Sequence, residues 1–90
     1  MGDPSERVAQ LESEGLTVTE WTDAPDTSYP EHAHPYDEVR VVLEGAMTIV
    51  VGDTPHELGP DDRIDLAAGE LHSARVHASG CRYLAGTRRG

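Results

Sequence analysis

The apolar residues at the start of the chain are spaced as in a helix. Val8 and Leu11 form a thin apolar stripe among polar neighbours. Asp3 and Pro4 precede this stripe as a cap and a first helical residue, and Gly15 follows it as a natural stop. We therefore expect a short, weakly amphipathic helix that has to pack against another element.

After this helix the apolar positions alternate with polar ones, and this period of two predicts β-strands. Clusters of Gly, Pro and Asp separate the strand-like runs, which are short. Pro25 and Pro30 place a loop at residues 22–31, whereas Gly45 and Gly80 are expected to end strands. The predicted strands cover residues 16–21, 36–43, 46–51, 56–58, 63–66, 71–77 and 81–85.

Many short strands with one terminal helix indicate an all-β sandwich or barrel. The chain has 90 residues, which is enough for one small domain. We expect a helical segment at residues 1–15, a barrel at residues 16–85 and a flexible tail at residues 86–90.

The strand around residues 39–43 carries apolar side chains on both of its faces. Val42 lies on one face. Val39, Val41 and Leu43 lie on the other face. Such a strand is covered twice, by the core on one side and by the helix or a partner subunit on the other. Because the short helix covers only part of a sheet, we expect a homodimer.

Composition narrows the possible partners. Seventeen acidic residues against seven arginines give a formal charge of −10, which repels nucleic acids and anionic membranes. An acidic surface without lysine serves solubility and would also suit a salt-rich cytoplasm. With no apolar run of about 20 residues and no signal peptide, we expect a cytoplasmic protein. The single cysteine, Cys81, excludes an internal disulfide and is expected to be buried.

Candidate chemistry comes from the placement of the five histidines. His32 and His34 are two residues apart, so they project to one side of an extended backbone. Glu38 follows with the same parity, and His72 lies far away in the sequence, just after Gly69. Three imidazoles and one carboxylate suit one divalent transition metal, with Mn, Fe, Co, Ni and Zn all possible.

These residues carry a resemblance to the cupin family. The segment His32-Ala-His34-Pro-Tyr-Asp-Glu38, followed by six residues and Gly45, resembles the first cupin motif. The segment Ala67-Ala68-Gly69-Glu70-Leu71-His72 is similar to the second motif, Pro-x-Gly-x-x-His. The resemblance extends over roughly residues 26–76.

Some motif positions depart from the family pattern. The glycines that open the two cupin motifs fall on Asp26 and Asp61. The family's proline falls on Ala67, and its closing asparagine falls on Val76. None of these is a ligand position. Two other histidines match no motif position and are assigned to surface or structural roles: His56 and His77.

The resemblance implies a small cupin jelly-roll barrel with metal ligands His32, His34, Glu38 and His72. It permits dioxygenase, isomerase and lyase reactions on a small polar molecule, and the sequence does not choose among them. A metal-containing module that binds or senses a ligand without turnover is the alternative. A protein that keeps its metal for stability is a third interpretation.

Two further side chains share the parity of Glu38 and are expected to face the barrel interior, Tyr36 and Arg40. A buried guanidinium needs an acidic partner, which either Asp65 or Glu38 can supply. Alternatively, Arg40 holds the carboxylate of a small acid bound beside the metal. Tyr36 is a core residue, a rim residue or a ligand contact.

Overall fold

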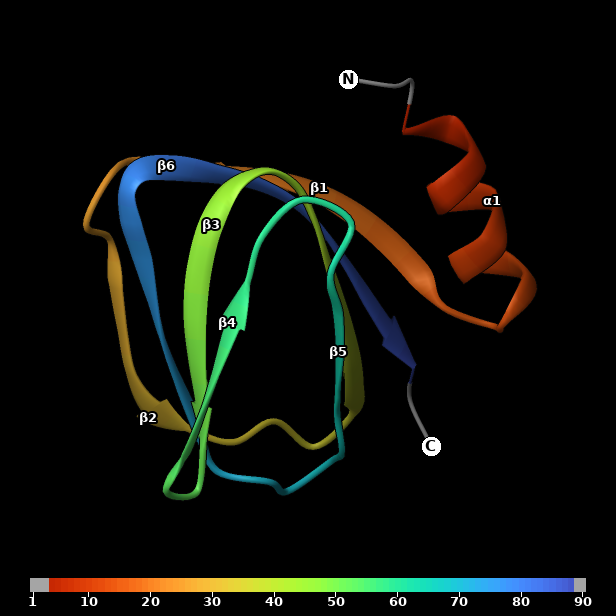
Figure 1. Cartoon of the computed structure of the whole chain (residues 1–90). Helices are drawn as coiled ribbons and strands as arrows, with labels where there is room; N and C mark the ends of the chain where they lie inside the picture. Colours follow the sequence, from red (N-terminus) through yellow and green to blue (C-terminus); the bar gives the residue numbers. More distant parts are fainter. Residues whose placement is uncertain (1–3, 89–90) are drawn as a thin grey trace.

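The computed structural model describes residues 4–88 as a curled antiparallel sheet with one helix outside it (Figure 1). The all-β fold with a short N-terminal helix is therefore confirmed. The elements are α1 (Ser5–Ser13), β1 (Thr17–Asp23), β2 (Ser28–His32), β3 (Asp37–Val51), β4 (Thr54–Leu58), β5 (Arg63–Leu66) and β6 (His72–Arg88).

β3 and β6 are long strands that serve both walls of the barrel. The first part of β3 pairs with β5 and with the end of β6. Its last part pairs with β4 and with the start of β6. β1 pairs along the end of β6, and β2 pairs along its start. One wall is thus β1-β6-β3-β5, and the facing wall is β2-β6-β3-β4.

The predicted strand ends at Gly45 and Gly80 were wrong, because β3 and β6 continue through them and bend (Figure 1). Both glycines have positive φ angles, +79° and +74°. A Cβ atom on Gly45 would lie 2.0 Å from the carbonyl oxygen of Gly80. The two glycines therefore permit a close backbone contact at the bends, where the β3–β6 register shifts.

Other boundaries also differ from the prediction. β2 occupies part of the expected loop at residues 22–31, and Pro30 is tolerated because β2 pairs on one side only, with β6. β6 continues to Arg88, so residues 86–88 are strand where a tail was expected, and residues 89–90 lie outside the described residues. Pro4 occupies the cap position instead of the first helical position, so the helix begins one residue later than expected. The predicted cap, Asp3, lies outside the described residues.

Apolar side chains form two clusters, one inside the barrel and one beneath α1. Val42 belongs to the inner cluster, whereas Val39 and Val41 pack in the outer one with Leu11 of the helix. The prediction that this strand is covered on both faces is confirmed. Since the protein's own helix provides the outer cover, this face no longer argues for a homodimer, which stays a prediction.

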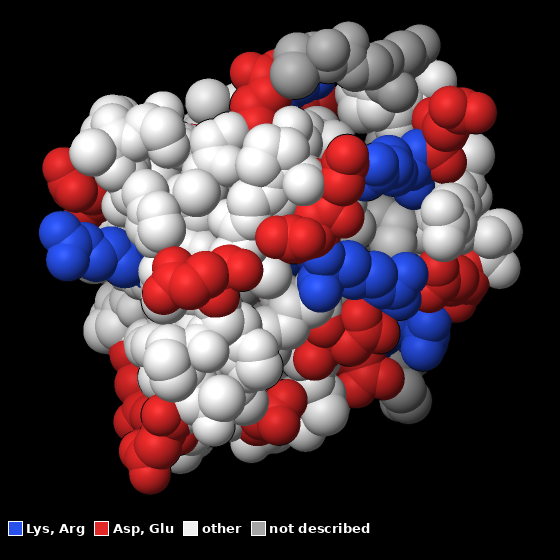
Figure 2. Space-filling model, in the orientation of Figure 1, with Lys and Arg blue, Asp and Glu red and all other residues white. Residues whose placement is uncertain are grey.

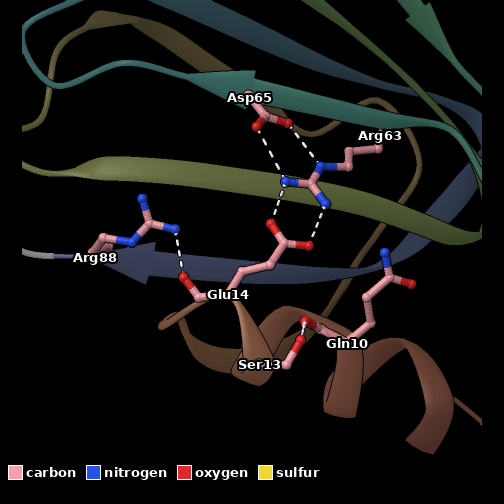
Figure 3. Close-up of polar contacts among 6 residues, drawn as sticks. All are labelled: Gln10, Ser13, Glu14, Arg63, Asp65 and Arg88. Carbon is pink, nitrogen blue, oxygen red and sulfur yellow. Dashed lines mark hydrogen bonds and ion pairs between the residues drawn. The ribbon is translucent and has the colours of Figure 1, made fainter.

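Charged contacts fasten the end of α1 to the barrel (Figure 3). The Glu14 carboxylate accepts two hydrogen bonds from Arg63, at 2.8 and 2.7 Å. Arg63 also donates to Asp65, and Arg88 donates to the backbone carbonyl of Glu14 at 2.7 Å. The hydrogen bond from Arg63 lowers the pKa of the Glu14 carboxyl.

On the face shown in Figure 2, the basic side chains lie beside acidic ones. Within residues 4–88, five of the six arginines form an ion pair with a carboxylate, and Arg88 donates to the Glu14 carbonyl. The described part of the chain contains no helix long and apolar enough to cross a membrane.

The Gly45–Gly80 contact predicts the effect of adding a single methyl group. Gly45→Ala should lower the free energy of unfolding by roughly 3 kcal/mol or more, since the new Cβ meets backbone. Gly52→Ala is the control, because Gly52 also has positive φ but nothing within 4 Å of its Cβ position. That control should cost only about 1–2 kcal/mol. Urea unfolding measures both, and equal losses would contradict the contact.

The Arg63–Glu14 contact predicts a pH-dependent stability. A carboxyl with a lowered pKa in the folded state contributes stability above its unfolded pKa, and this contribution is lost as the pH falls through the folded value. Glu14→Gln should therefore lower the melting temperature near neutral pH, and the difference should shrink below pH 4.5, the ordinary pKa of a glutamate carboxyl. Glu12→Gln, an exposed change on the same helix, is the control. A difference that stays constant with pH would argue against the contact.

Candidate metal centre

The four predicted ligands are brought to one region where three strands begin or end. β2 ends at His32, β6 begins at His72, and these two residues are direct partners in the sheet. Glu38 is the second residue of β3. His34 lies in the connection between β2 and β3.

The two motif segments are joined by one backbone–backbone hydrogen bond and one hydrogen bond to a side chain. Gly69 N–H donates to the carbonyl of His34 at 2.8 Å, and Ala68 N–H donates to Asp37 Oδ1 at 2.9 Å. Gly69 has a φ of +79°, which glycine adopts without steric cost. The loop that leads into His72 is thereby held against the loop that carries His34.

Three histidines form a compact cluster. The ring centroids are 4.7 Å apart for His32 and His34, and 4.5 Å apart for His32 and His72. The His34 and His72 centroids are separated by 5.2 Å. One ring nitrogen from each lies within 4.8 Å of the others, so the three can share one cation.

Two of these rings are oriented by backbone carbonyls. His32 Nδ1 lies 2.6 Å from the Pro30 oxygen, and His72 Nδ1 lies 3.0 Å from the Glu70 oxygen. Because a carbonyl only accepts, each Nδ1 carries a proton, and in the neutral form of each ring this leaves the lone pair on Nε2. His72 Nε2 is buried without a hydrogen-bond partner.

Glu38 and Arg40 form a buried ion pair beside the histidines. Arg40 Nε donates to Glu38 Oε2 at 2.9 Å, and the two residues are only 7% and 5% exposed. The other oxygen, Glu38 Oε1, is buried without a hydrogen-bond partner and lies 3.5 Å from His34 Nε2. Burial lowers the pKa of His34, which favours its neutral, ligating form.

The donor set fits a divalent metal ion. A buried imidazole nitrogen and a buried carboxylate oxygen left without partners each cost free energy. The group of ligand atoms within 4.8 Å of one another contains the three histidines and not Glu38, whose free oxygen lies 3.5 Å from His34 Nε2. The sequence prediction that His32, His34 and His72 come together agrees with this geometry. Arg40 has Glu38 as its acidic partner, whereas Asp65 binds Arg63 instead.

A cavity of about 330 Å³ adjoins the cluster, lined by His32, His34, Glu38 and Arg40 among others. The remaining lining residues include every Trp and Tyr of the chain, and sequence reasoning singled out only one of them, Tyr36, for this site. The aromatic lining residues are Trp21, Tyr29, Tyr36 and Tyr83.

Asp23 organises two of these tyrosines. Tyr29 and Tyr83 both donate to Asp23 Oδ2, at 2.7 and 2.9 Å. Burial raises the pKa of both phenols, so they remain protonated donors. The Arg40 guanidinium lies 5.2 Å from the centroid of the Tyr83 ring. Sequence analysis placed both Asp23 and Tyr29 in the loop at residues 22–31, and the shared parity of Asp23 with Trp21 is the signal that could have revealed it.

Residues 19–85 match the family model of the cupin domain. The chain belongs to the cupin family. A dimethylsulfoniopropionate lyase, DddQ from Ruegeria pomeroyi, is 36% identical over 50 residues, which are 54% of this chain. The cupin chain spans about a quarter of the length of that lyase, since the match covers 25% of it.

Solved structures show the same fold. The crystal structure of DddQ superposes with a TM-score of 0.74 and 27% identity, covering 81% of this chain and 38% of that one. The polyketide cyclase RemF from Streptomyces resistomycificus gives a TM-score of 0.72 and 31% identity, covering 83% of this chain and 55% of the cyclase. A Rhizobium leguminosarum protein of unknown function gives 0.77 and 24%, covering 83% and 71%.

The residues assigned to structural roles lie where the sequence placed them. His56 is exposed on β4. His77 is half-buried, with Nε2 2.7 Å from Thr48 Oγ1, and takes no part in the cluster. Cys81 is a buried free thiol, and burial raises its pKa to about 11.

The buried ion pair predicts a large effect for a substitution that keeps the charge. Arg40→Lys removes the Nε donor and the guanidinium plane over Tyr83, so the free energy of unfolding should fall by about 1–3 kcal/mol. Arg75→Lys is the matched control, because Arg75 is exposed and its ion pair measures 3.5 Å. That control should change stability by less than about 0.5 kcal/mol in chemical unfolding. Equal effects would place Arg40 outside the buried network.

Proposed function

We propose that this cupin is a metal-dependent enzyme acting on a small polar molecule in the 330 Å³ cavity. Its ligands are His32, His34, Glu38 and His72, which hold one divalent transition metal. The observation that carries the proposal is the pair of buried, unpartnered atoms, His72 Nε2 and Glu38 Oε1. Polar atoms are rarely buried in this state unless something outside the chain satisfies them.

The ligand set suits Mn, Fe, Co, Ni or Zn. When bound, such a metal supplies a Lewis acid, or a site for dioxygen, to a substrate that coordinates it. The protein's contribution is positional. The carbonyls of Pro30 and Glu70 orient two imidazoles, and Arg40 restrains the Glu38 carboxylate through one oxygen while leaving the other free.

Tyr36 is the side chain we assign to substrate contact. Its ring stacks on His34 with centroids 4.9 Å apart and an angle of 8° between the planes. Among the described residues its hydroxyl has no hydrogen-bond partner, unlike those of Tyr29 and Tyr83. Arg40 is a weaker candidate for holding a substrate carboxylate, because its Nε already serves Glu38.

The relatives support catalysis without choosing a reaction. One similar protein is named a lyase and another a polyketide cyclase. The chain spans only part of each, so their activities are not transferred to it. Dioxygenase, isomerase and lyase reactions differ in their need for oxygen. Turnover of candidate small acids should therefore be measured in air and under nitrogen.

A ligand-binding or sensor module is the second candidate function. Within residues 4–88, no carboxylate or imidazole lines the cavity besides the proposed ligands themselves. The nearby Asp23 is occupied by two phenol donors. A site with so few spare acid–base groups suits capture as well as turnover. Tight binding of a metabolite with no product formed would favour this candidate.

Metal analysis tests the proposal directly. The purified protein should contain one divalent metal per chain, and His72→Ala should lose it while the circular dichroism spectrum stays that of a folded barrel. His56→Ala, which changes an exposed histidine away from the cluster, is the control and should keep the metal. Full metal occupancy in His72→Ala would disprove the ligand assignment.

A further inference from the structure

All the Trp and Tyr side chains of this protein line the same cavity. The chain contains one Trp, three Tyr and no Phe, and each of the four borders the space beside the histidine cluster. The rest of the barrel interior is filled by aliphatic side chains, Met47 and Cys81. Flat apolar rings are thus absent from the core elsewhere in the described residues and concentrated where a ligand would sit.

These rings come from separate elements that meet at the cavity. Trp21 on β1 and Tyr83 on β6 are direct partners in the sheet, so their side chains are neighbours on one face. Tyr29 comes from β2, and Tyr36 precedes β3. Trp21 is 51% exposed although it is the largest apolar side chain of the protein. A ligand in the cavity would cover part of that indole.

The charges around the cavity disfavour a cationic guest. The Arg40 guanidinium lies over Tyr83, and the proposed metal adds a second positive charge. The two carboxylates that could offset them are engaged. Glu38 faces Arg40 and the histidines, and Asp23 accepts from two phenols. Aromatic walls can bind cations, but here they are more suited to the face of a neutral or anionic ring.

We propose that the cavity accepts a small oxygen chelator that carries a planar ring, such as an aromatic hydroxy acid. A hydroxyl oxygen and a carboxylate oxygen on neighbouring carbons of the ligand would coordinate the metal. The ring of the ligand packs against the indole of Trp21 and the neighbouring phenols. The metal half of this inference rests on the proposed function. A cavity of about 330 Å³ is at the lower end of ligand-site volumes, about 300–1,000 Å³, which suits one ring and excludes a nucleotide or a long lipid.

A matched pair of acids tests the ring preference. Mandelate and lactate present the same hydroxyl and carboxylate oxygens to a metal, and they differ in bearing a phenyl or a methyl group. In calorimetric titrations of the zinc-loaded protein, mandelate should bind about tenfold or more tightly than lactate. The fluorescence of Trp21, the single tryptophan, should change on addition of mandelate more than on addition of lactate.

Two variants locate the effect at the indole. Trp21→Leu keeps an apolar side chain but removes the aromatic face, and it should reduce the mandelate-to-lactate preference about threefold or more with lactate affinity unchanged. Trp21→Phe restores a ring and should keep most of the preference. Because Trp21 is half exposed, both variants should fold.

The outcomes separate this inference from the proposed function. Equal Kd values for the two acids, binding of neither acid, or an equal loss for both in Trp21→Leu would overturn the ring preference. Zinc content of the same samples tests the metal site independently. If no zinc is bound, the metal site fails, and the same two acids still decide the ring preference because the aromatic walls need no metal.

Discussion

The bends of β3 and β6 at Gly45 and Gly80 are the constraint on which the site depends. His72 pairs with Val51 at the far end of β3, thirteen positions after Glu38. On a straight strand these positions would be about 43 Å apart. The strand instead folds over itself, and His34 comes within 3.5 Å of Glu38 while its ring lies 5.2 Å from that of His72. A methyl group on Gly45 would obstruct this bend, so a glycine outside the site determines whether the site can form.

At the site, two buried side chains each have one polar atom that is hydrogen-bonded and one that is not. The unpartnered atoms are the ones available to a ligand. Glu38 is bonded through one oxygen, and His72 through one nitrogen, while the second atom of each is buried and unpartnered. Each bonded atom fixes the orientation of its side chain. Burying these unpartnered atoms costs folding free energy, which the two apolar clusters and the contacts of α1 offset. A region optimised for stability alone would pair both atoms or replace them with apolar side chains.

The features that depend on the spacing of nearby residues were predicted from the sequence. Apolar side chains on both faces of residues 39–43 predicted a strand that is covered on both sides, and the histidine spacing predicted the cluster. Long-range pairing decided the rest. Pro30 indicated a loop, yet β2 forms because β6 offers one free edge at its start. Tyr29 was missed with that strand. The homodimer was argued from a face that α1 was expected to leave open, and the length of the helix alone could not show how fully Leu11 covers it.

The departures from the cupin motifs show that a motif position can demand a backbone conformation more than a residue type. Asp26 and Asp61, which stand at the family's opening glycines, are the two non-glycine residues with positive φ among those described, at 63° and 74°. Aspartate tolerates this region at a cost of about 1–2 kcal/mol relative to glycine. Each side chain also reaches an arginine, Arg75 for Asp26 and Arg7 for Asp61. The positive-φ turns are therefore made by aspartate here, and the fold still brings His32, His34 and His72 together.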